Sequence, residues 1–134
     1  MVKLSPHHNK LGHALNGNRR SKCLKFAHWN LDSALLQYKL CEIEATIAQV
    51  KPSILVISES NLRSTTDLNT VQIPGYQLFT AKPLQNPIIE MSCVVVYMSN
   101  DISGSLREDL MVDDFLSIWV ELNTSKNSKK ILVS

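Results

Sequence analysis

The feature that most constrains the fold is a strand, helix, strand pattern between Leu24 and Glu59. The apolar and aromatic run Leu24–Trp29 predicts a buried strand, and the aliphatic run Ile54–Ile57 predicts a second strand that is covered on both faces. A helix between two strands implies a parallel pair with a right-handed crossover, because parallel strands need a long connection. We therefore expect a parallel pair of strands with a helix packed beside it.

The segment between the two strands has the spacing of an amphipathic helix. Asp32, with Ser33 beside it, is a residue type that caps helix N-termini, and Pro52 ends the pattern because the residue before a proline avoids helical angles. Apolar residues recur at spacings of four, three, four and three, which predicts one buried helix face made of Leu36, Leu40, Ile43, Ile47 and Val50.

A polar residue stands at the end of each predicted strand. Asn30 follows the first and Glu59 follows the second. Because the carboxyl ends of parallel strands share one edge of a sheet, where ligand sites of layered α/β folds commonly lie, we expect the two residues to be neighbours. The alternative is structural, with Asn30 capping or turning the chain and Glu59 as a polar strand end. His28 shares the side of Asn30 by alternation and is expected to be a packed or hydrogen-bonded histidine.

The remainder of the chain predicts loops and antiparallel strands. Residues 61–70 are polar and 81–91 hold two prolines, so both are expected to be connections. Aromatic residues at alternate strand positions, Tyr76, Tyr97 and Trp119, are expected to pack in the core or on a sheet face rather than to stack on nucleic-acid bases. The predicted strands are Tyr76–Phe79 after a turn at Ile73–Tyr76, Val94–Tyr97 before a turn at Ser99–Asp101, Leu116–Leu122, and Ile131–Val133 after a turn at Lys126–Lys129.

Length and composition fit one globular domain. The chain has 134 residues, of which 44% are hydrophobic and 19% charged, and its net charge of +2 is too small to indicate nucleic acid or membrane. No apolar run approaches the roughly 20 residues of a transmembrane helix, and no secretory signal is evident, so an intracellular, soluble chain is expected. Residues 1–22 predict a flexible basic tail, solvated rather than binding metal or nucleic acid, in front of a domain at 23–134. Cys23, Cys41 and Cys93 are expected to be reduced and mostly buried.

From about Leu24 to its end, the chain resembles the endonuclease/exonuclease/phosphatase superfamily, and within it the endonuclease domains of non-LTR retrotransposons. The resemblance rests on Trp29–Asn30, the helix, Ile57–Glu59, Ile73–Tyr76 and the Val94–Asn100 strand, in this order. It implies an α+β fold with a mixed sheet, the N-terminal half of a four-layered α-β-β-α sandwich. It also implies hydrolysis of phosphoesters with Mg²⁺ or Mn²⁺, with Asn30 as a catalytic residue near the scissile phosphate and Glu59 as a metal ligand.

The same resemblance implies that the tyrosine, the Asp-x-Asn segment and the Asp-His pair of this superfamily belong beyond Ser134. On that basis we expect a truncated domain that is inactive alone, whose ancestral substrate is DNA and whose compartment is the nucleus if it derives from a retrotransposon. A half-sandwich would lack the sheet that covers its apolar face, so a protein partner or self-association at an open sheet edge is expected. The alternatives are a non-catalytic interaction module and an enzyme completed by a partner chain.

Overall fold

The computed structural model describes residues 23–63, 65–80, 91–110, 117–123 and 132–133. The predicted tail at 1–22 and the predicted turn at 126–129 lie outside these residues, as does nearly all of the connection at 81–91. None of the helices in the described ranges is long and apolar enough to cross a membrane. The elements follow in the order β1 Phe26–Asn30, α1 Leu36–Val50, β2 Ile54–Arg63, the 3-10 helix η1 Leu68–Val71, β3 Tyr76–Thr80, β4 Met91–Ser99, β5 Ser103–Leu106, the 3-10 helix η2 Glu108–Leu110, β6 Val120–Asn123 and β7 Leu132–Val133.

The strands form two sheets, and the first of them is mixed. The first sheet has the order β1-β2-β4-β3 and the second has the order β5-β6-β7. β1 and β2 are parallel, with Phe26 opposite Ile54 and Asn30 opposite Ser58, while β4 runs antiparallel to both β2 and β3. The predicted parallel pair and the α+β class with a mixed sheet are therefore confirmed.

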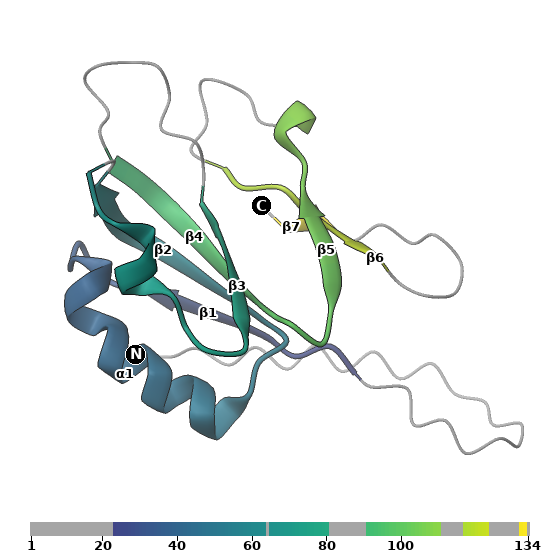
Figure 1. Cartoon of the computed structure of the whole chain (residues 1–134), viewed down its shortest axis with the longest axis horizontal. Coiled ribbons are helices and arrows are strands. Elements are labelled where there is room, and N and C mark those ends of the chain that lie inside the picture. Colours follow the sequence, from purple (N-terminus) through teal and green to yellow (C-terminus); the bar gives the residue numbers. More distant parts are fainter. Residues whose placement is uncertain (1–22, 64, 81–90, 111–116, 124–131, 134) are drawn as a thin grey trace, which may run out of the picture.

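The molecule is layered, with α1 on one face of the first sheet and the second sheet on the other (Figure 1). Alternate residues of β2 enter different cores, because successive strand residues point to opposite faces. Leu55 and Ile57 pack toward α1. Between the sheets, the buried residues are Ile54, Val96, Met98, Ile118, Val120 and Leu122.

The second sheet corrects one expectation. A bare apolar face was predicted for the first sheet, but Ile54, Val96 and Met98 are at most 1% exposed because β5 and β6 supply partners for them. β1 is different, since Phe26 keeps 45% of its surface exposed. The partner sheet is thus present over β2 and β4, whereas Phe26 on β1 stays largely exposed.

The start of α1 was predicted wrongly. Asp32 does not cap the helix: the N-cap is Leu35, which has no side-chain cap, and the helix begins at Leu36. Asp32 and Ser33 instead have positive φ angles of 50° and 63°, in the left-handed region. The reason is local, because the Asn30 side-chain oxygen accepts a hydrogen bond from the Asp32 backbone N–H at 2.7 Å and so turns the chain before the helix can begin. The predicted end before Pro52 is confirmed.

A loop was expected at residues 61–70, but most of these residues are in regular elements. Residues 61–63 belong to β2 and residues 68–71 form η1, which Asp67 caps by accepting a hydrogen bond from the Asn69 N–H. β5 was missed because Ser103–Leu106 has little apolar content. Gly104 makes this strand possible, since a Cβ there would lie 2.8 Å from the Glu121 backbone oxygen of β6.

The remaining strands lie close to where they were predicted. β3, β4 and β7 overlap the expected runs, and Gly75 takes a φ of 83° in the turn before β3. β6 covers only the last part of the predicted Leu116–Leu122 strand, and Leu116 lies outside the described residues.

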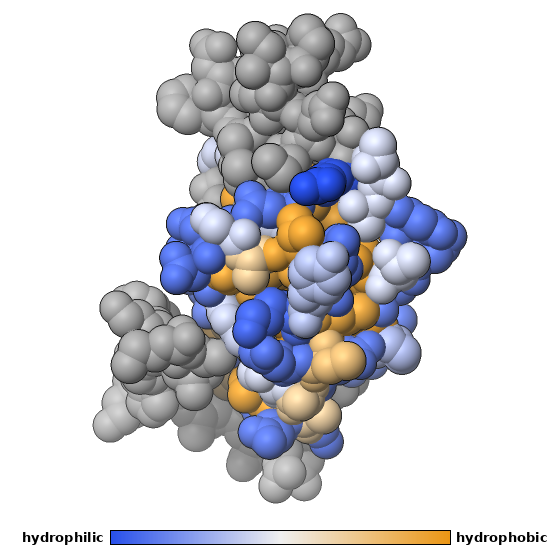
Figure 2. All heavy atoms as spheres, turned by 90° about the vertical axis from the view of Figure 1, so that its left-hand side faces the viewer, coloured by the Kyte–Doolittle hydropathy of each residue, from blue (hydrophilic) through white to orange (hydrophobic). Residues whose placement is uncertain are grey.

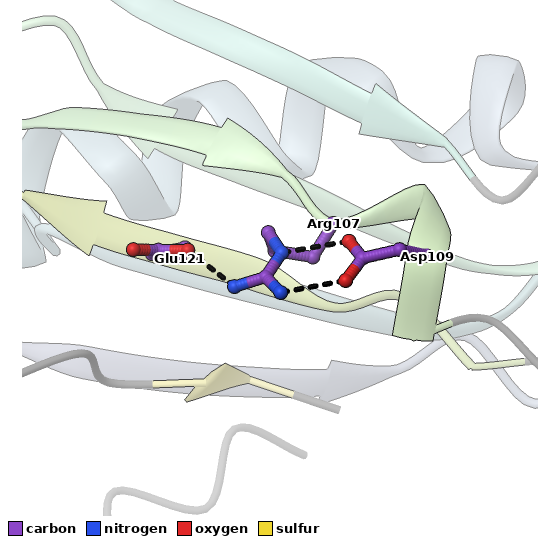
Figure 3. Close-up of polar contacts among 3 residues, drawn as sticks. All are labelled: Arg107, Asp109 and Glu121. Carbon is purple, nitrogen blue, oxygen red and sulfur yellow. Dashed lines mark hydrogen bonds and ion pairs between the residues drawn. The ribbon is translucent and has the colours of Figure 1, made fainter.

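Arg107, directly after β5, links η2 to β6 through its guanidinium group (Figure 3). It donates two hydrogen bonds to Asp109 of η2, at 2.7 and 2.6 Å, and one to Glu121 of β6 at 2.5 Å. The hydrogen bonds that Arg107 donates, first to Asp109 and then to Glu121, raise the pKa of Arg107 above its ordinary value. The guanidinium therefore stays charged and holds the turn after β5 against β6.

Tyr76 and Tyr97 pack as predicted, whereas Cys23 and Cys41 are not buried as expected. Tyr97 is fully buried and donates to the Val71 carbonyl at 2.7 Å, and Tyr76 donates to the Pro52 carbonyl at 2.7 Å. Cys23 and Cys41 are exposed. Cys23 precedes the first strand and Cys41 lies on the solvent side of α1, so neither position offers a core to enter.

Candidate metal and phosphate site

The carboxyl ends of β1 and β2 bring Asn30 and Glu59 into direct contact. The Asn30 side-chain amide donates a hydrogen bond from Nδ2 to Glu59 Oε1 at 3.0 Å. Residues 30 and 58 are register partners in the parallel ladder, so Glu59 follows directly after the partner of Asn30. The predicted proximity of the two residues is confirmed; their catalytic and metal-binding roles are taken up as proposals below.

A bulge in β2 makes this contact possible. Ser58 pairs with Val94 and Leu62 pairs with Ser92, so three residues of β2 lie opposite one residue of β4. By regular alternation Glu59 would follow Leu55 and Ile57 toward α1, whereas Asn30 points to the other face of the sheet. Glu59 instead has a φ of 53°, which departs from the regular strand. The bulge therefore turns the carboxylate toward Asn30.

Backbone in the left-handed region is concentrated at this site. Four of the five non-glycine residues with positive φ that are found in the described ranges lie here: Asp32, Ser33, Glu59 and Asn61. Each such residue costs on the order of 1–3 kcal/mol unless its surroundings hold it in place, and such residues tend to cluster at functional sites. No feature of the sequence marks Asn61, which lies in a polar run that predicts a loop.

Side chains and backbone of the two segments are interlinked. Ser33 Oγ lies 3.5 Å from Glu59 Oε2 in a donor position, and Asn61 Nδ2 donates to the Ser33 carbonyl at 2.7 Å. Ser33 and Asn61 were not predicted as site residues, because Ser33 fits a helix cap and Asn61 fits a loop. Ser33 and Asn61 lie beside Glu59 only because the bulge in β2 turns Glu59 and Asn61 toward the segment before α1.

His28 is hydrogen-bonded, as predicted. Its Nε2 lies 2.8 Å from Ser58 Oγ, on the neighbouring strand. The pairing uses one ring nitrogen and holds the imidazole against β2.

The oxygen donors at this edge fit a hard divalent cation. Mg²⁺ is typically held by one or two carboxylates together with water and substrate phosphate oxygens. The exposed Glu59 carboxylate can accept more bonds than the two it shares with Asn30 and Ser33. Within the described ranges, no group of three His, Cys, Asp or Glu side chains converges on one point. The residues at this edge therefore fit an exposed cation site in which Glu59 is the one charged protein ligand and water supplies the other oxygens.

Figure 2 looks onto this end of the molecule, to which β1 and β2 run in Figure 1. Hydrophilic residues lie over much of it, with hydrophobic residues visible between them. A separate open pocket of about 940 Å³ lies where β1 and β2 begin, and its lining includes Lys25, Lys51 and Asp101 but neither Asn30 nor Glu59. The candidate site is thus a surface edge and not this pocket.

Comparison with known proteins identifies the fold. No model of a protein family and no curated protein sequence matches the chain. Among solved structures, the chain is similar to the AP endonuclease LMAP from Leishmania major, with a TM-score of 0.57 and 20% sequence identity. The match covers 81% of this chain and 38% of that one, so the chain spans less than half the length of the endonuclease it resembles. At this identity the likeness shows the fold alone: the chain has an α+β sandwich fold like that of the AP endonuclease.

Proposed function

We propose that the chain supplies the metal-binding wall of a divalent-metal-dependent phosphodiesterase site of the endonuclease type. Glu59 is the ligand for Mg²⁺ or Mn²⁺, and Asn30 is the catalytic residue beside the scissile phosphate. The observation that carries this proposal is the hydrogen-bonded pair of Asn30 and Glu59 at the carboxyl edge of two parallel strands. The similarity of the fold to an AP endonuclease supports it.

Each residue has a definite task in this site. A bound divalent ion would offset the negative charge that develops on the phosphoryl oxygens during hydrolysis. Asn30 orients the Glu59 carboxylate through one N–H of its amide. An amide has two N–H donors, so the second one can donate to a phosphate oxygen. The Asn30 oxygen is held by the Asp32 backbone N–H, which fixes the amide so that its NH₂ group faces the site.

We further propose that this chain binds metal without turning over a substrate. Activation of water also needs a general base, and among the described residues the carboxylate and amide that meet at this edge do not make a full hydrolytic set. His28 is hydrogen-bonded to Ser58 rather than to Asn30 or Glu59. The sequence resemblance supports DNA as the ancestral substrate, a retrotransposon-type origin and, with it, the nucleus as the compartment.

Mn²⁺ titration of the full chain, followed by the loss of the free-ion EPR signal, tests the metal site. Glu59→Gln is expected to weaken Mn²⁺ binding at least 10-fold, whereas Glu44→Gln on the exposed side of α1 leaves it unchanged. Equal binding by the wild type and Glu59→Gln would contradict the role of Glu59.

Incubation of the same proteins with supercoiled DNA and Mg²⁺ tests the lack of turnover. We expect no nicking by any of them. Nicking by the wild type that disappears in Glu59→Gln would overturn the inactivity and would instead favour an enzyme completed within the chain or by its self-association.

A second candidate function is favoured by the exposure of Phe26. This residue is 45% exposed on β1, an edge strand of the first sheet, and a free strand edge next to apolar surface is prone to pair with another chain. For this function, the chain would be an interaction module that associates with a second copy through β1. Sedimentation analysis should then show a dimer that Phe26→Lys dissociates, and a wild-type monomer at high concentration would exclude it.

A further inference from the structure

We propose that Asn61 and Ser33 are positioning residues that hold the Glu59 carboxylate in its metal-binding orientation. The inference rests on the proposed role of Glu59 as a metal ligand. It adds two residues that neither alternation along β2 nor helix-capping patterns indicate.

The segment before α1 is fastened to β2 on both sides of Glu59. On one side the Leu31 N–H donates to the Ser58 carbonyl at 3.0 Å. On the other side Asn61 Nδ2 donates to the Ser33 carbonyl at 2.7 Å. The two bonds attach to the residue before Glu59 and to the residue two positions after it. The segment is thereby fixed across the bulge, with Glu59 between its attachment points.

A buried residue in the bulge holds it against the core. Ser60, between Glu59 and Asn61, is fully buried, while Glu59 is exposed. Left-handed backbone at Glu59 and Asn61 brackets this buried residue. The side chains of Glu59 and Asn61 are thereby directed to the end of β1 and the segment before α1, and away from the core, as their hydrogen bonds show.

These attachments fix the carboxylate from two directions. Glu59 Oε1 accepts from Asn30, and Oε2 faces Ser33 Oγ at 3.5 Å. Ser33 Oγ can stay there only while the Ser33 backbone keeps its left-handed conformation, and that backbone is held through its carbonyl by Asn61. Asn61 therefore acts on Glu59 through Ser33. This contact needs a donor, which the Asn61 amide supplies and a carboxylate at this position would not.

Two glycine variants separate the side chains from the backbone. Glycine adopts positive φ without strain, so Asn61→Gly and Ser33→Gly remove the amide and the hydroxyl while allowing the same backbone. Lys51→Gly is the matched control, since Lys51 also has a positive φ, of 48°, but lies at the other end of α1. Full-length protein of each variant is titrated with Mn²⁺ by EPR, and thermal unfolding is recorded in parallel.

Asn61→Gly is expected to weaken Mn²⁺ binding about 10-fold or more, the range found when partners of metal ligands are removed, and Ser33→Gly to weaken it less. Lys51→Gly should bind as the wild type does. The side-chain amide resonances of Asn30 in ¹⁵N NMR spectra should also shift in Asn61→Gly without metal, because the Glu59 carboxylate that they contact is released. A purely structural role would lower the unfolding midpoint and leave both these signals unchanged.

The outcomes separate this inference from the function on which it rests. Wild-type binding and unshifted Asn30 resonances in Asn61→Gly, together with weakened binding in Glu59→Gln, would overturn the positioning role and leave the metal site standing. Equal binding by the wild type and Glu59→Gln would overturn the metal site, and the positioning role with it.

Discussion

The two halves of β2 differ in what their residues do. Ile54–Ser58 is regular strand, paired with β1 on one side and β4 on the other, and its side chains alternate between two cores. Glu59–Arg63 contains the bulge and two residues with positive φ. One strand thus joins a half that stabilises the fold to a half that orients the carboxylate for which metal binding is proposed.

The difference shows where strain can be tolerated. A left-handed residue costs on the order of 1–3 kcal/mol, and it persists only where neighbouring contacts hold it. The regular half supplies those contacts, because its burial against α1 and the second sheet fixes the point at which the bulge begins. The comparison can be tested by altering each half and asking whether stability and metal binding respond separately.

The largest effect is expected in the regular half. Ile57 is fully buried among residues that face α1, so Ile57→Ala should lower the free energy of unfolding by about 2–5 kcal/mol, through lost burial and the cavity left behind. Urea unfolding followed by far-UV circular dichroism measures this loss. Ile57→Val, with an expected loss of about 0.5–1.5 kcal/mol, keeps the comparison measurable if the alanine variant does not fold.

Tyr38→Ala is the control for this substitution. Tyr38 lies on α1 with 76% of its surface exposed, so its removal should change stability by no more than about 0.5 kcal/mol. A similar loss in Tyr38→Ala and Ile57→Ala would mean that the core between α1 and the first sheet does not govern stability.

A smaller effect is expected at Tyr97, which is paired with Leu55 in the regular half. Its hydroxyl donates to the Val71 carbonyl, and Tyr97→Phe leaves that buried carbonyl without this donor. We expect a loss of about 1–2 kcal/mol in the free energy of unfolding at neutral pH. Tyr76→Phe, whose hydroxyl bonds Pro52 from a partly exposed site, should lose less.

The same residue predicts a dependence on pH. Burial, and secondarily the charge of Glu44, raises the pKa of Tyr97 above its ordinary value of 10.0. The folded state then holds the phenolic proton more tightly than the unfolded state, so the stabilisation is complete below about pH 10 and declines as the pH rises beyond it. The stability difference between wild type and Tyr97→Phe, measured by urea unfolding from pH 8 to 11, should shrink above pH 10. A constant difference would contradict the burial of the hydroxyl.

The structure of the regular half of β2 could be predicted from the sequence, and that of the bulged half could not. The aliphatic run at 54–57, the spacing of the helix and the rule for parallel strands were enough to place Asn30 beside Glu59. The bulge was invisible because it depends on pairing with β4, which is distant in sequence. Asp32 and Ser33 were assigned to a cap by residue type, but the Asn30 side chain competes for the Asp32 N–H and turns the chain there. The second sheet was underestimated because β5 is short and polar.

The smallest effect concerns strain that lies outside the site. Lys51 has a φ of 48° where α1 ends, and its N–H bonds the Ile47 carbonyl, an arrangement in which glycine is the usual residue. Lys51→Gly removes about 1–2 kcal/mol of strain and adds about 0.5–1 kcal/mol of entropy cost, so the net gain in stability is between about 0 and 1.5 kcal/mol. Thermal and urea unfolding measure the gain, and Mn²⁺ affinity should not change. If Lys51→Gly altered Mn²⁺ binding as Asn61→Gly does, metal affinity would follow the stability of the whole fold, and the bulged half of β2 would have no separate role in orienting Glu59.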